Sequence, residues 1–280
     1  MSTQNPDRYA VIGNPISQTK SPLIHMAFAA ESGQHLVYSA LEGPLGQFAA
    51  TVDQFRAEGG KGLNVTVPFK LDACAYATDL SDEARAAGAA NALKFEGERV
   101  YAQNFDGVGL VRDITHNLGQ PLAGKRVLLL GAGGAARGAI LPILREGPAC
   151  LFVANRTVDK AQALVQAFRA NGAGDTLQGG GYEALAELRF DVVINATSAS
   201  LSAALPPLPA SAFEADGLAY ELVYGKGLTP FLKLAQQAGV RQLADGAGML
   251  VEQAAEAFAW WRGVRPETRA MIARISVPLV

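Results

Sequence analysis

The chain has 280 residues, 18% of them charged, and a formal net charge of −2. This length fits one large domain or two smaller ones, and the near-neutral charge gives no reason to expect nucleic acid or an anionic membrane as a partner. The polar start lacks a signal core, and no apolar run is long enough to cross a bilayer. We therefore expect a cytoplasmic protein, monomeric or homodimeric, with Cys74 and Cys150 as buried thiols and no metal site.

The first third of the chain alternates between strand and helix patterns. A helix is expected to open at Ser21-Pro22, with Ser21 as its N-cap and Pro22 in its first turn. Two short runs joined by Glu96-Gly97-Glu98-Arg99 favour a hairpin. The predicted strands cover 9–13, 36–41, 62–67, 92–95 and 100–103, and the predicted helices cover 22–31, 45–57, a segment from Pro68, and 108–118.

Polar residues that could take part in binding or catalysis lie at the end of the third of these strands. Asn64 and Thr66 lie two positions apart, so on a strand they point to the same side, where they could bind a polyol or hydroxy acid. Solvated polar residues on a half-exposed strand would show the same spacing. Lys70 falls in the first turn of the next helix, where the helix dipole disfavours a cation. A lysine that exchanges protons suits an alcohol oxidation, although a surface lysine also fits this position.

Asp106 follows the hairpin at the junction between the two halves of the chain. Asp-Gly is an ordinary turn sequence. A carboxylate close to Lys70 would instead hold the ammonium group and tune its affinity for protons. The spacing of the two residues does not show that they meet.

The segment Arg126–Arg137 is the most specific pattern in the chain. An apolar run from Val127 to Leu130 ends in Gly131, Gly133 and Gly134, and a helical pattern opens at Ala135. Strand, glycine turn and helix in this order are typical of a dinucleotide-binding unit, in which small residues let the backbone approach a pyrophosphate. A turn that merely packs a helix on a strand is the simpler interpretation. The following strand and amphipathic helix favour the nucleotide site.

The residues that follow the next strand, at 150–154, distinguish between NADP(H) and NAD(H) as the nucleotide. NAD sites usually place a carboxylate here for the ribose 2′-hydroxyl, whereas this chain has Asn155, Arg156 and Thr157, with Lys160 one turn later. Arg156 can form a bidentate contact with a phosphate, and Lys160 adds positive charge. We therefore predict NADP(H), although either cation alone could be a solvated surface charge.

The remaining pattern completes an α/β protein with two lobes. Further strands are expected at 191–195, 218–223 and 241–243, a Pro-rich loop at 198–209, and a helix with one apolar stripe at 249–261. We predict a substrate-binding and catalytic domain over 1–110, joined by C-terminal helices of 245–280 that pack back on it. Residues 111–244 would form a Rossmann-type NADP-binding domain.

The chain resembles the shikimate dehydrogenase family over nearly its whole length. The segments that carry the resemblance are 9–15 (YAVIGNP), 21–25 (SPLIH), 64–70 (NVTVPFK), 88–91 (GAAN), 104–107 (NFDG), 131–135 (GAGGA), 155–157 (NRT), 195–198 (NATS) and 246–253 (GAGMLVEQ). The family reduces 3-dehydroshikimate to shikimate with NADPH, so the resemblance implies this activity.

The resemblance also implies roles for individual residues. Lys70 and Asp106 fall on the catalytic pair. Thr19 and Ser21 fall on the carboxylate-binding pair, and Tyr224 is a further substrate contact. Positions that bind the substrate hydroxyls match Asn64, Thr66, Asn91, Asp106 and Gln253. The NADP pocket matches Gly131, Gly133, Gly134, Ala135, Asn155, Arg156, Thr157, Lys160 and Thr197, with Met249 beside the nicotinamide.

Three positions depart from the family pattern and leave alternatives open. Gln18-Thr19 replaces His-Ser, Phe105 replaces the Thr before the catalytic Asp, and Gln103 replaces an Asp. A paralogue acting on quinate or another cyclic hydroxy acid would fit these changes. A non-catalytic nucleotide- or metabolite-binding protein is the third alternative, but retention of both Lys70 and Asp106 argues against it.

Overall fold

The computed structural model describes residues 5–170, 172–197, 199 and 205–280, and the chain divides into two compact units. The first unit contains Met1–Gly109 and Val251–Met271, and the second contains Leu110–Leu250 and Ile272–Val280. Ser198 and part of the Pro-rich loop expected at 198–209 lie outside the described residues.

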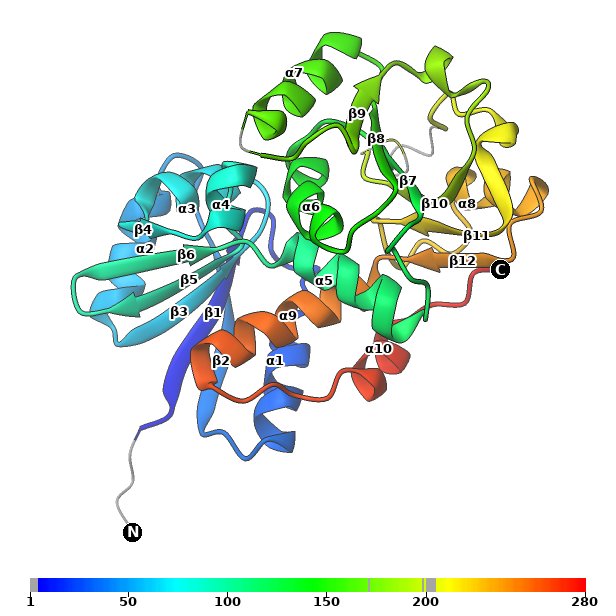
Figure 1. Cartoon of the computed structure of the whole chain (residues 1–280). Helices are drawn as coiled ribbons and strands as arrows, with labels where there is room; N and C mark the ends of the chain where they lie inside the picture. Colours follow the sequence, from blue (N-terminus) through cyan, green and yellow to red (C-terminus); the bar gives the residue numbers. More distant parts are fainter. Residues whose placement is uncertain (1–4, 171, 198, 200–204) are drawn as a thin grey trace. The chain divides into compact units, whose positions relative to one another are not determined.

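The first unit is built on a six-stranded sheet with the order β2-β1-β3-β5-β6-β4 (Figure 1). Strands β1, β2 and β3 are parallel, and β5 runs antiparallel to both β3 and β6. Its elements are β1 (Asp7–Gly13), α1 (Ser21–Glu31), β2 (Leu36–Glu42), α2 (Phe48–Ala57), β3 (Gly60–Val65), α3 (Lys70–Tyr76), β4 (Asp79–Leu80), α4 (Asp82–Ala87), β5 (Ala92–Glu96) and β6 (Arg99–Gln103). The helix α5 (Asp106–Arg112) then leads into the second unit.

The second unit is built on a parallel six-stranded sheet with the order β12-β11-β10-β7-β8-β9. Its elements are the π-helical η1 (Asp113–Asn117), β7 (Arg126–Leu130), α6 (Gly134–Arg145), β8 (Cys150–Ala154), α7 (Val158–Arg169), β9 (Leu177–Gly180), the 3₁₀ turn η2 (Tyr182–Leu185), β10 (Phe190–Asn195), the 3₁₀ turn η4 (Ala210–Ala212), β11 (Phe213–Glu221), α8 (Pro230–Gln237) and β12 (Gln242–Asp245). The chain order reverses between β7 and β10, and the carboxyl ends of strands at such a point are where α/β sheets bind ligands.

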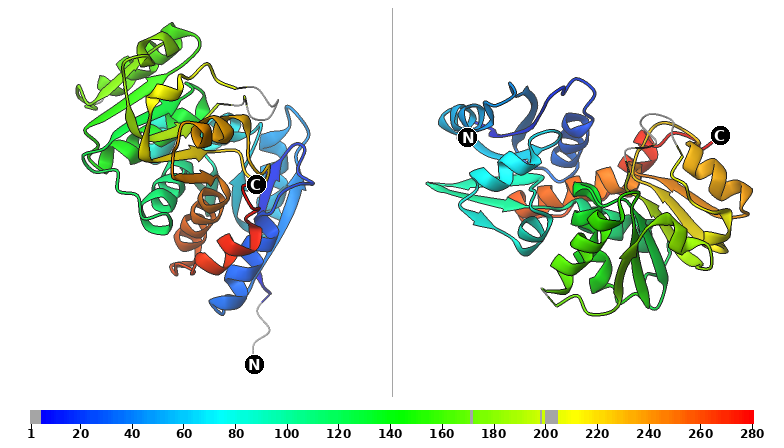
Figure 2. Two further views of the ribbon diagram at one scale, coloured as in Figure 1. Left: turned by 90° about the vertical axis from the view of Figure 1, so that its right-hand side faces the viewer. Right: turned by 90° about the horizontal axis from the view of Figure 1, so that it is seen from above.

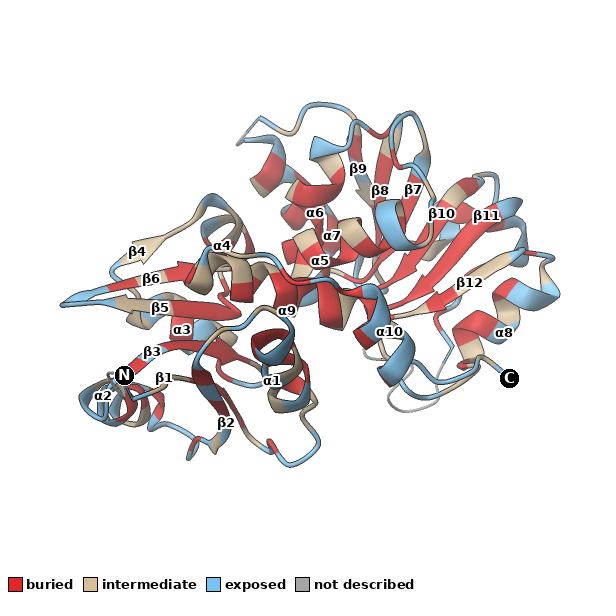
Figure 3. Ribbon diagram, turned by 90° about the horizontal axis from the view of Figure 1, so that it is seen from below, coloured by how far each residue is buried: buried red, intermediate tan, exposed pale blue. Residues whose placement is uncertain are grey.

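The sheet of the second unit is buried on both faces. Strands β7, β10 and β11 are coloured as buried along most of their length (Figure 3). Leu128 and Leu130 pack with Phe231 and Leu232 of α8 in one apolar cluster. This burial explains why β7 reads as an unbroken apolar run, as expected for a strand covered on both sides.

Two helices close to the C-terminus, α9 (Ala247–Arg262) and α10 (Arg269–Ile275), follow the second sheet. From Val251 onward α9 belongs to the first unit, where it lies beside α1 (Figure 2). Phe258 contacts Phe28 of α1 with ring centroids 5.8 Å apart, and Trp261 Nε1 donates to Leu93 O at 3.0 Å. A side chain at Gly62 would come within 2.7 Å of Trp261 Nε1, so glycine is needed for this close approach.

The structure confirms the predicted α/β class, the Rossmann-type sheet and the return of a C-terminal helix to the first lobe. Several local predictions were wrong. Ser21 is the first helical residue of α1 instead of its N-cap, and β3 ends at Val65, which leaves Thr66 outside the strand. The helix after Pro68 begins only at Lys70. The sequence patterns also missed β4, β9, α4 and α8, and they predicted C-terminal helices within 245–280 without placing α10.

The cysteines and the helices bear on two further expectations. Cys74 and Cys150 are both free thiols, as expected, although each is half-buried where the sequence predicted a buried thiol. Among the described helices, none is long and apolar enough to cross a membrane.

Candidate functional site

Lys70 and Asp106 meet in the first unit. Each is the first residue of a helix, α3 and α5 respectively. The turn that follows β3 closes through a hydrogen bond from Phe69 N to Thr66 O, 3.0 Å long, and places Lys70 directly after it. Lys70 Nζ donates to Asp106 Oδ2 at 2.6 Å, and the two side chains keep 30% and 16% of their exposure. The pair is therefore partly desolvated but still open to a ligand.

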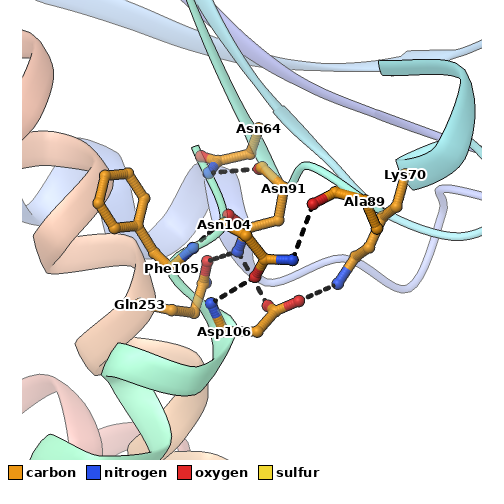
Figure 4. Close-up of polar contacts among 8 residues, drawn as sticks. All are labelled: Asn64, Lys70, Ala89, Asn91, Asn104, Phe105, Asp106 and Gln253. Carbon is orange, nitrogen blue, oxygen red and sulfur yellow. Dashed lines mark hydrogen bonds and ion pairs between the residues drawn. The ribbon is translucent and has the colours of Figure 1, made fainter. Parts of the chain in front are cut away.

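Asn91 connects this pair to a helix from the other end of the chain (Figure 4). Its Nδ2 donates to Asp106 Oδ1 at 2.8 Å and to Gln253 Oε1 on α9 at 3.1 Å. Its Oδ1 accepts from Phe105 N at 2.8 Å. An amide nitrogen carries two hydrogens, so both are used in these contacts. Asn91 is 2% exposed, which leaves its amide fixed within the protein.

Asn104 shapes the start of α5. Its Oδ1 accepts from Asp106 N at 3.1 Å, and its Nδ2 donates to Ala89 O at 3.0 Å. A side chain that accepts from the amide two residues later initiates a turn or a helix. Asp106 thus opens a helix, and its carboxylate is aimed back at Lys70 and Asn91 (Figure 4).

A buried phenol fixes the orientation of Asn64. Tyr38 Oη donates to Asn64 Oδ1 at 2.6 Å, and Asn64 Nδ2 donates to Asn91 O at 3.3 Å. Burial raises the pKa of Tyr38 well above its usual value, while a hydrogen bond from Ser21 acts in the opposite direction. The phenol is therefore protonated at neutral pH and must donate, so the carbonyl oxygen of Asn64 is turned toward it.

His25 stacks on the same tyrosine. The rings of His25 and Tyr38 are 4.2 Å apart and almost parallel. Burial lowers the pKa of His25 to about 3, while an interaction with the Asn64 side chain acts in the opposite direction. His25 is accordingly a neutral part of the aromatic core.

The two hydroxyls expected to bind a carboxylate lie together. Thr19 Oγ1 donates to Ser21 Oγ at 3.2 Å, and Ser21 N donates to Thr19 Oγ1 at the same distance. Thr66, just beyond β3, is half-buried. Its methyl group occupies the space beside Gly13, where a Cβ would come within 2.5 Å of it.

The second unit contains a pocket of about 600 Å³ at the carboxyl ends of β7, β8 and β10. Its walls combine the glycine turn, the end of β8 and the segment after β10. The lining residues are Gly131, Ala132, Gly133, Gly134, Ala135, Asn155, Arg156, Tyr182, Ala196, Thr197, Ala199, Leu205, Pro206 and Pro207. Seven of the ten predicted cofactor residues are among these fourteen.

The glycine turn leaves room for a ligand. A Cβ at Gly133 or Gly134 would meet no atom within 4 Å, so open space lies directly beside the backbone. Gly131 has a φ of +106°, which favours glycine. The twelve-residue helix α6 begins at Gly134, so its unpaired N–H groups and its positive dipole end face this turn. Backbone, space and dipole together fit a pyrophosphate.

The residues after β8 divide between the pocket wall and the start of α7. Asn155 Nδ2 donates to Thr157 O at 2.9 Å, and Thr157 precedes the first turn of α7, which contains Lys160. Thr157 and Lys160 are exposed and are not lining residues of the pocket. A second hollow of about 500 Å³ shares Arg156, Tyr182 and Pro207 with the first, and it also contains Glu183.

Tyr224 and Met249 belong to the second unit. Burial, and secondarily Asp245, raises the pKa of the Tyr224 phenol. Met249 lies on α9 four residues before Gln253, and its N–H donates to Tyr220 Oη at 3.3 Å. Neither side chain lines the pocket at the glycine turn.

Comparison with known proteins matches three consecutive parts of the chain. Residues 11–93 match a shikimate dehydrogenase substrate-binding domain, residues 113–204 a shikimate/quinate 5-dehydrogenase domain, and residues 246–275 a shikimate 5′-dehydrogenase C-terminal domain. The NADP(+) shikimate dehydrogenase of Dechloromonas aromatica strain RCB is 56% identical over 274 residues, covering 98% of this chain and 99% of that protein. The chain belongs to the shikimate dehydrogenase family.

Solved structures of proteins with similar sequences have the same fold. An Ael1 enzyme from Pseudomonas putida superposes with a TM-score of 0.93 at 60% identity. The match covers 98% of this chain and 100% of the Ael1 chain. The shikimate 5-dehydrogenase of Thermus thermophilus, solved with NADP(H) and shikimate, has a TM-score of 0.84 at 32% identity, with 95% of this chain and 97% of that chain covered.

Sequence reasoning missed several residues that shape the two sites of this shikimate dehydrogenase family member. Tyr38 lies on β2, 26 positions before the asparagine that it orients, and no local pattern connects the two. Tyr182 and Glu183 line the hollows around Arg156 from η2, a turn without a sequence signal. Asn104 could have been found, because Asn two residues before an Asp-Gly pair is a turn-forming pattern.

Proposed function

We propose that this chain catalyses the reversible NADP-dependent reduction of 3-dehydroshikimate to shikimate, with Lys70 and Asp106 handling the proton. The observation that carries the proposal is the 2.6 Å contact between Lys70 Nζ and Asp106 Oδ2 in a cluster of buried amides. The 56% identity to an NADP(+) shikimate dehydrogenase over 98% of the chain supports the same reaction.

The residues of the first unit would hold and move the proton. In the reduction direction, Lys70 Nζ donates a proton to the substrate carbonyl oxygen as that oxygen becomes a hydroxyl. Asp106 Oδ2 accepts from the same Nζ and keeps it in place, while Asn91 holds the other carboxylate oxygen. NADPH, when bound, supplies the hydride, and the protein contributes orientation and electrostatics.

Polar side chains near this pair would recognise the substrate. We assign its hydroxyls to Asn64, Thr66, Asn91, Asp106 and Gln253, its carboxylate to Thr19 and Ser21, and a further contact to Tyr224. Because Asp106 and Gln253 use both amide hydrogens of Asn91, this residue would meet a hydroxyl only as an acceptor, through Oδ1. Asn64 approaches the ligand as a donor, because Tyr38 occupies its carbonyl oxygen. Thr19 and Ser21 already lie within hydrogen-bond distance of each other, so one carboxylate can reach both.

The pocket of the second unit would bind NADP(H). The glycine turn and the start of α6 fit the pyrophosphate, and Arg156 supplies a positive charge for the 2′-phosphate. We assign to the cofactor the residues Gly131, Gly133, Gly134, Ala135, Asn155, Arg156, Thr157, Lys160, Thr197 and Met249. The predicted cytoplasmic location and oligomeric state stay predictions.

A paralogue with altered substrate preference is the second candidate. Phe105 directly precedes Asp106, and its ring packs edge-to-face on Trp260 at 5.8 Å. The ring extends away from Lys70 toward α9 (Figure 4), so it adds apolar surface at the Gln253 side of the cluster. A binding protein without activity is disfavoured, because it would not need the Lys70–Asp106 pair.

Initial rates of NADP+ reduction with shikimate and with quinate test the proposal. We expect shikimate to be the preferred substrate, and Lys70→Ala to lower kcat by about 10²-fold or more, because general acid–base groups contribute this much. NADP+ binding to Lys70→Ala should be unchanged. A preference for quinate would support the paralogue. NADP+ binding without turnover of either acid would contradict both enzymatic proposals.

A further inference from the structure

A buried carboxylate lies behind the cofactor pocket of the second unit. Glu221, the last residue of β11, and Asn195, the last residue of β10, are both fully buried. Asn195 Nδ2 donates to Glu221 Oε2 at 3.0 Å. Neither residue lines the pocket, so the proposed assignment gives neither of them a role.

Asn195 connects the carboxylate to the pocket wall. Thr197 lines the pocket, and both its Oγ1 and its N–H donate to Asn195 Oδ1, at 2.7 and 3.1 Å. One amide side chain therefore faces Glu221 with its nitrogen and Thr197 with its oxygen.

The groups at either end leave this amide a single orientation. Both oxygens of Glu221 accept hydrogen bonds, Oε2 from Asn195 and Thr229 and Oε1 from Val223 N, and a backbone N–H such as that of Thr197 only donates. If the Asn195 amide were rotated by 180°, its oxygen would face the Glu221 carboxylate and its NH₂ group would face the Thr197 N–H. Both contacts would then be repulsive, and buried polar groups left unpaired are costly. Glu221 thus determines which atom Thr197 meets.

The other contacts of Glu221 keep the carboxylate in place. Thr229 Oγ1 donates to the same Oε2 at 3.2 Å, and Val223 N donates to Oε1 at 3.4 Å. Thr229 is also the N-cap of α8, where it accepts from Leu232 N. The carboxylate is therefore held by the N-cap residue of α8 and by the segment directly after β11.

We propose that Glu221 and Asn195 are positioning residues for the nucleotide: Glu221 orients the Asn195 amide, and this amide holds the hydroxyl and N–H of Thr197 at the pocket wall. With its own hydrogen committed to Asn195, the Thr197 hydroxyl can only accept. Ala199 N already donates to it at 3.3 Å, so one lone pair is left to accept a hydrogen bond from the bound nucleotide. This inference rests on the proposed binding of NADP+ in this pocket.

An exchange of the amide and the carboxylate between the two positions tests the inference. Asn195→Asp replaces the donor toward Glu221 with an acceptor, and Glu221→Gln supplies a donor in return. In the double variant, the amide introduced at position 221 can donate to the carboxylate introduced at position 195, whose second oxygen still accepts from Thr197. The measurement is the Kd of NADP+ by isothermal titration calorimetry on the full chain, together with the Kd of shikimate and the unfolding temperature.

We expect Asn195→Asp to raise the Kd of NADP+ about tenfold or more, and the double variant to return it to within about threefold of the native chain. The Kd of shikimate should stay within about twofold throughout. At saturating NADP+, kcat should recover in Asn195→Asp, because a displaced pocket wall weakens binding and leaves the Lys70–Asp106 pair intact. A general loss of structure would lower kcat and shikimate binding as well.

Asn117→Asp is the control for the change from amide to carboxylate, made at an exposed position. Asn117 Nδ2 donates to another buried carboxylate of the second unit, Asp113, at 2.9 Å, and Asn117 does not line the pocket. Its Asp variant should lower the unfolding temperature without raising the Kd of NADP+ more than about twofold.

The outcomes separate this inference from the proposed function. The inference alone would be overturned if the native chain binds NADP+ but the double variant has a Kd of NADP+ no lower than that of the weaker single variant. A native chain that does not bind NADP+ would overturn the proposed cofactor as well. If Asn195→Asp does not fold, the comparison is between Glu221→Gln and the double variant. A higher Kd of NADP+ in Glu221→Gln that recovers in the double variant would support the inference. Equal Kd values in the two variants would overturn it.

Discussion

Asn91 holds one oxygen of the Asp106 carboxylate and leaves the other to Lys70. The Nδ2–Oδ1 distance is 2.8 Å, and the Lys70 contact on Oδ2 is 2.6 Å. A carboxylate clamped at both oxygens cannot rotate, so the ammonium group is held in one place. Because the remaining Asn91 hydrogen is used by Gln253, the same amide also fixes a residue of α9.

Asn91→Asp should lower kcat with shikimate by about 10²-fold. The substitution keeps the acceptor for Phe105 N but places an oxygen against Asp106 Oδ1, where two carboxylates repel each other. The Lys70–Asp106 geometry would then be lost, and a misplaced catalytic group lowers the rate by about this factor. Steady-state kinetics measure the effect. NADP+ affinity should be unchanged, and a folded variant with native kcat would show that Asn91 does not position the pair.

Tyr38→Phe should raise the KM for shikimate about fivefold without changing the KM for NADP+. The ring can still stack on His25, but Asn64 loses the donor that fixes its carbonyl oxygen. A single neutral hydrogen bond has roughly this value. Tyr9→Phe is the control, since Tyr9 is equally buried and stacks on Trp261 instead. Equal KM values in the two variants would contradict the role given to Tyr38.

Arg156→Gln should reduce the preference for NADP+ over NAD+. Charge-assisted hydrogen bonds to a phosphate are worth about 10- to 100-fold in affinity, so the KM for NADP+ should rise by this factor. The KM for NAD+, which has no 2′-phosphate, should change less than threefold. Arg241→Gln removes an exposed arginine paired with Asp216 in the same unit and should alter neither KM. A parallel rise in both KM values would place Arg156 elsewhere on the nucleotide.

His25 should make the fold less stable in acid. Its pKa is about 3 in the folded state and 6.5 ordinarily, so between these values the unfolded chain binds the additional proton. The free energy of unfolding therefore decreases as the pH falls below 6.5, by about 1.4 kcal/mol per pH unit from this residue. At neutral pH the histidine is uncharged in both states and has no such effect.

Denaturation with urea between about pH 7 and pH 4.5 measures this dependence. His25→Phe keeps a ring against Tyr38 and should lose stability less steeply than the native chain as the pH decreases. The exposed His35 is the control, and His35→Gln should follow the native profile. Identical slopes for His25→Phe and the native chain would contradict the buried neutral state.

Local signals were sufficient for the parts of the fold that they encode directly. The glycine turn after β7, the βα alternation and the hairpin of β5 and β6 depend on nearby residues, and the structure has them. The strand β9 was missed because Leu177-Gln-Gly-Gly has no strand pattern and is held by pairing with β8. Ser21 was assigned as a cap because Ser before Pro favours one, whereas here its hydroxyl interacts with Thr19 and Tyr38.

The candidate site shows the limit of sequence reasoning more clearly. Lys70 and Asp106 could each be selected as chemically suitable, but their contact spans 36 positions and depends on the turn before α3 and on Asn104. Residue type suggests a role, whereas tertiary packing decides which atoms meet. For the same reason Tyr38, Asn195 and Glu221 were not predicted, since each acts on a residue from another strand or loop.

The helix α9 also determines when the first unit can be finished during synthesis. Phe258 and Trp261 cover Phe28, His25 and Tyr38, yet they are made after the entire second sheet. The ribosome must therefore release almost the whole chain before this aromatic core can close. A messenger RNA truncated after β12 would encode the complete sheet of the second unit, attached to a first unit whose aromatic core is open. Such an exposed core would be recognised by chaperones and proteases.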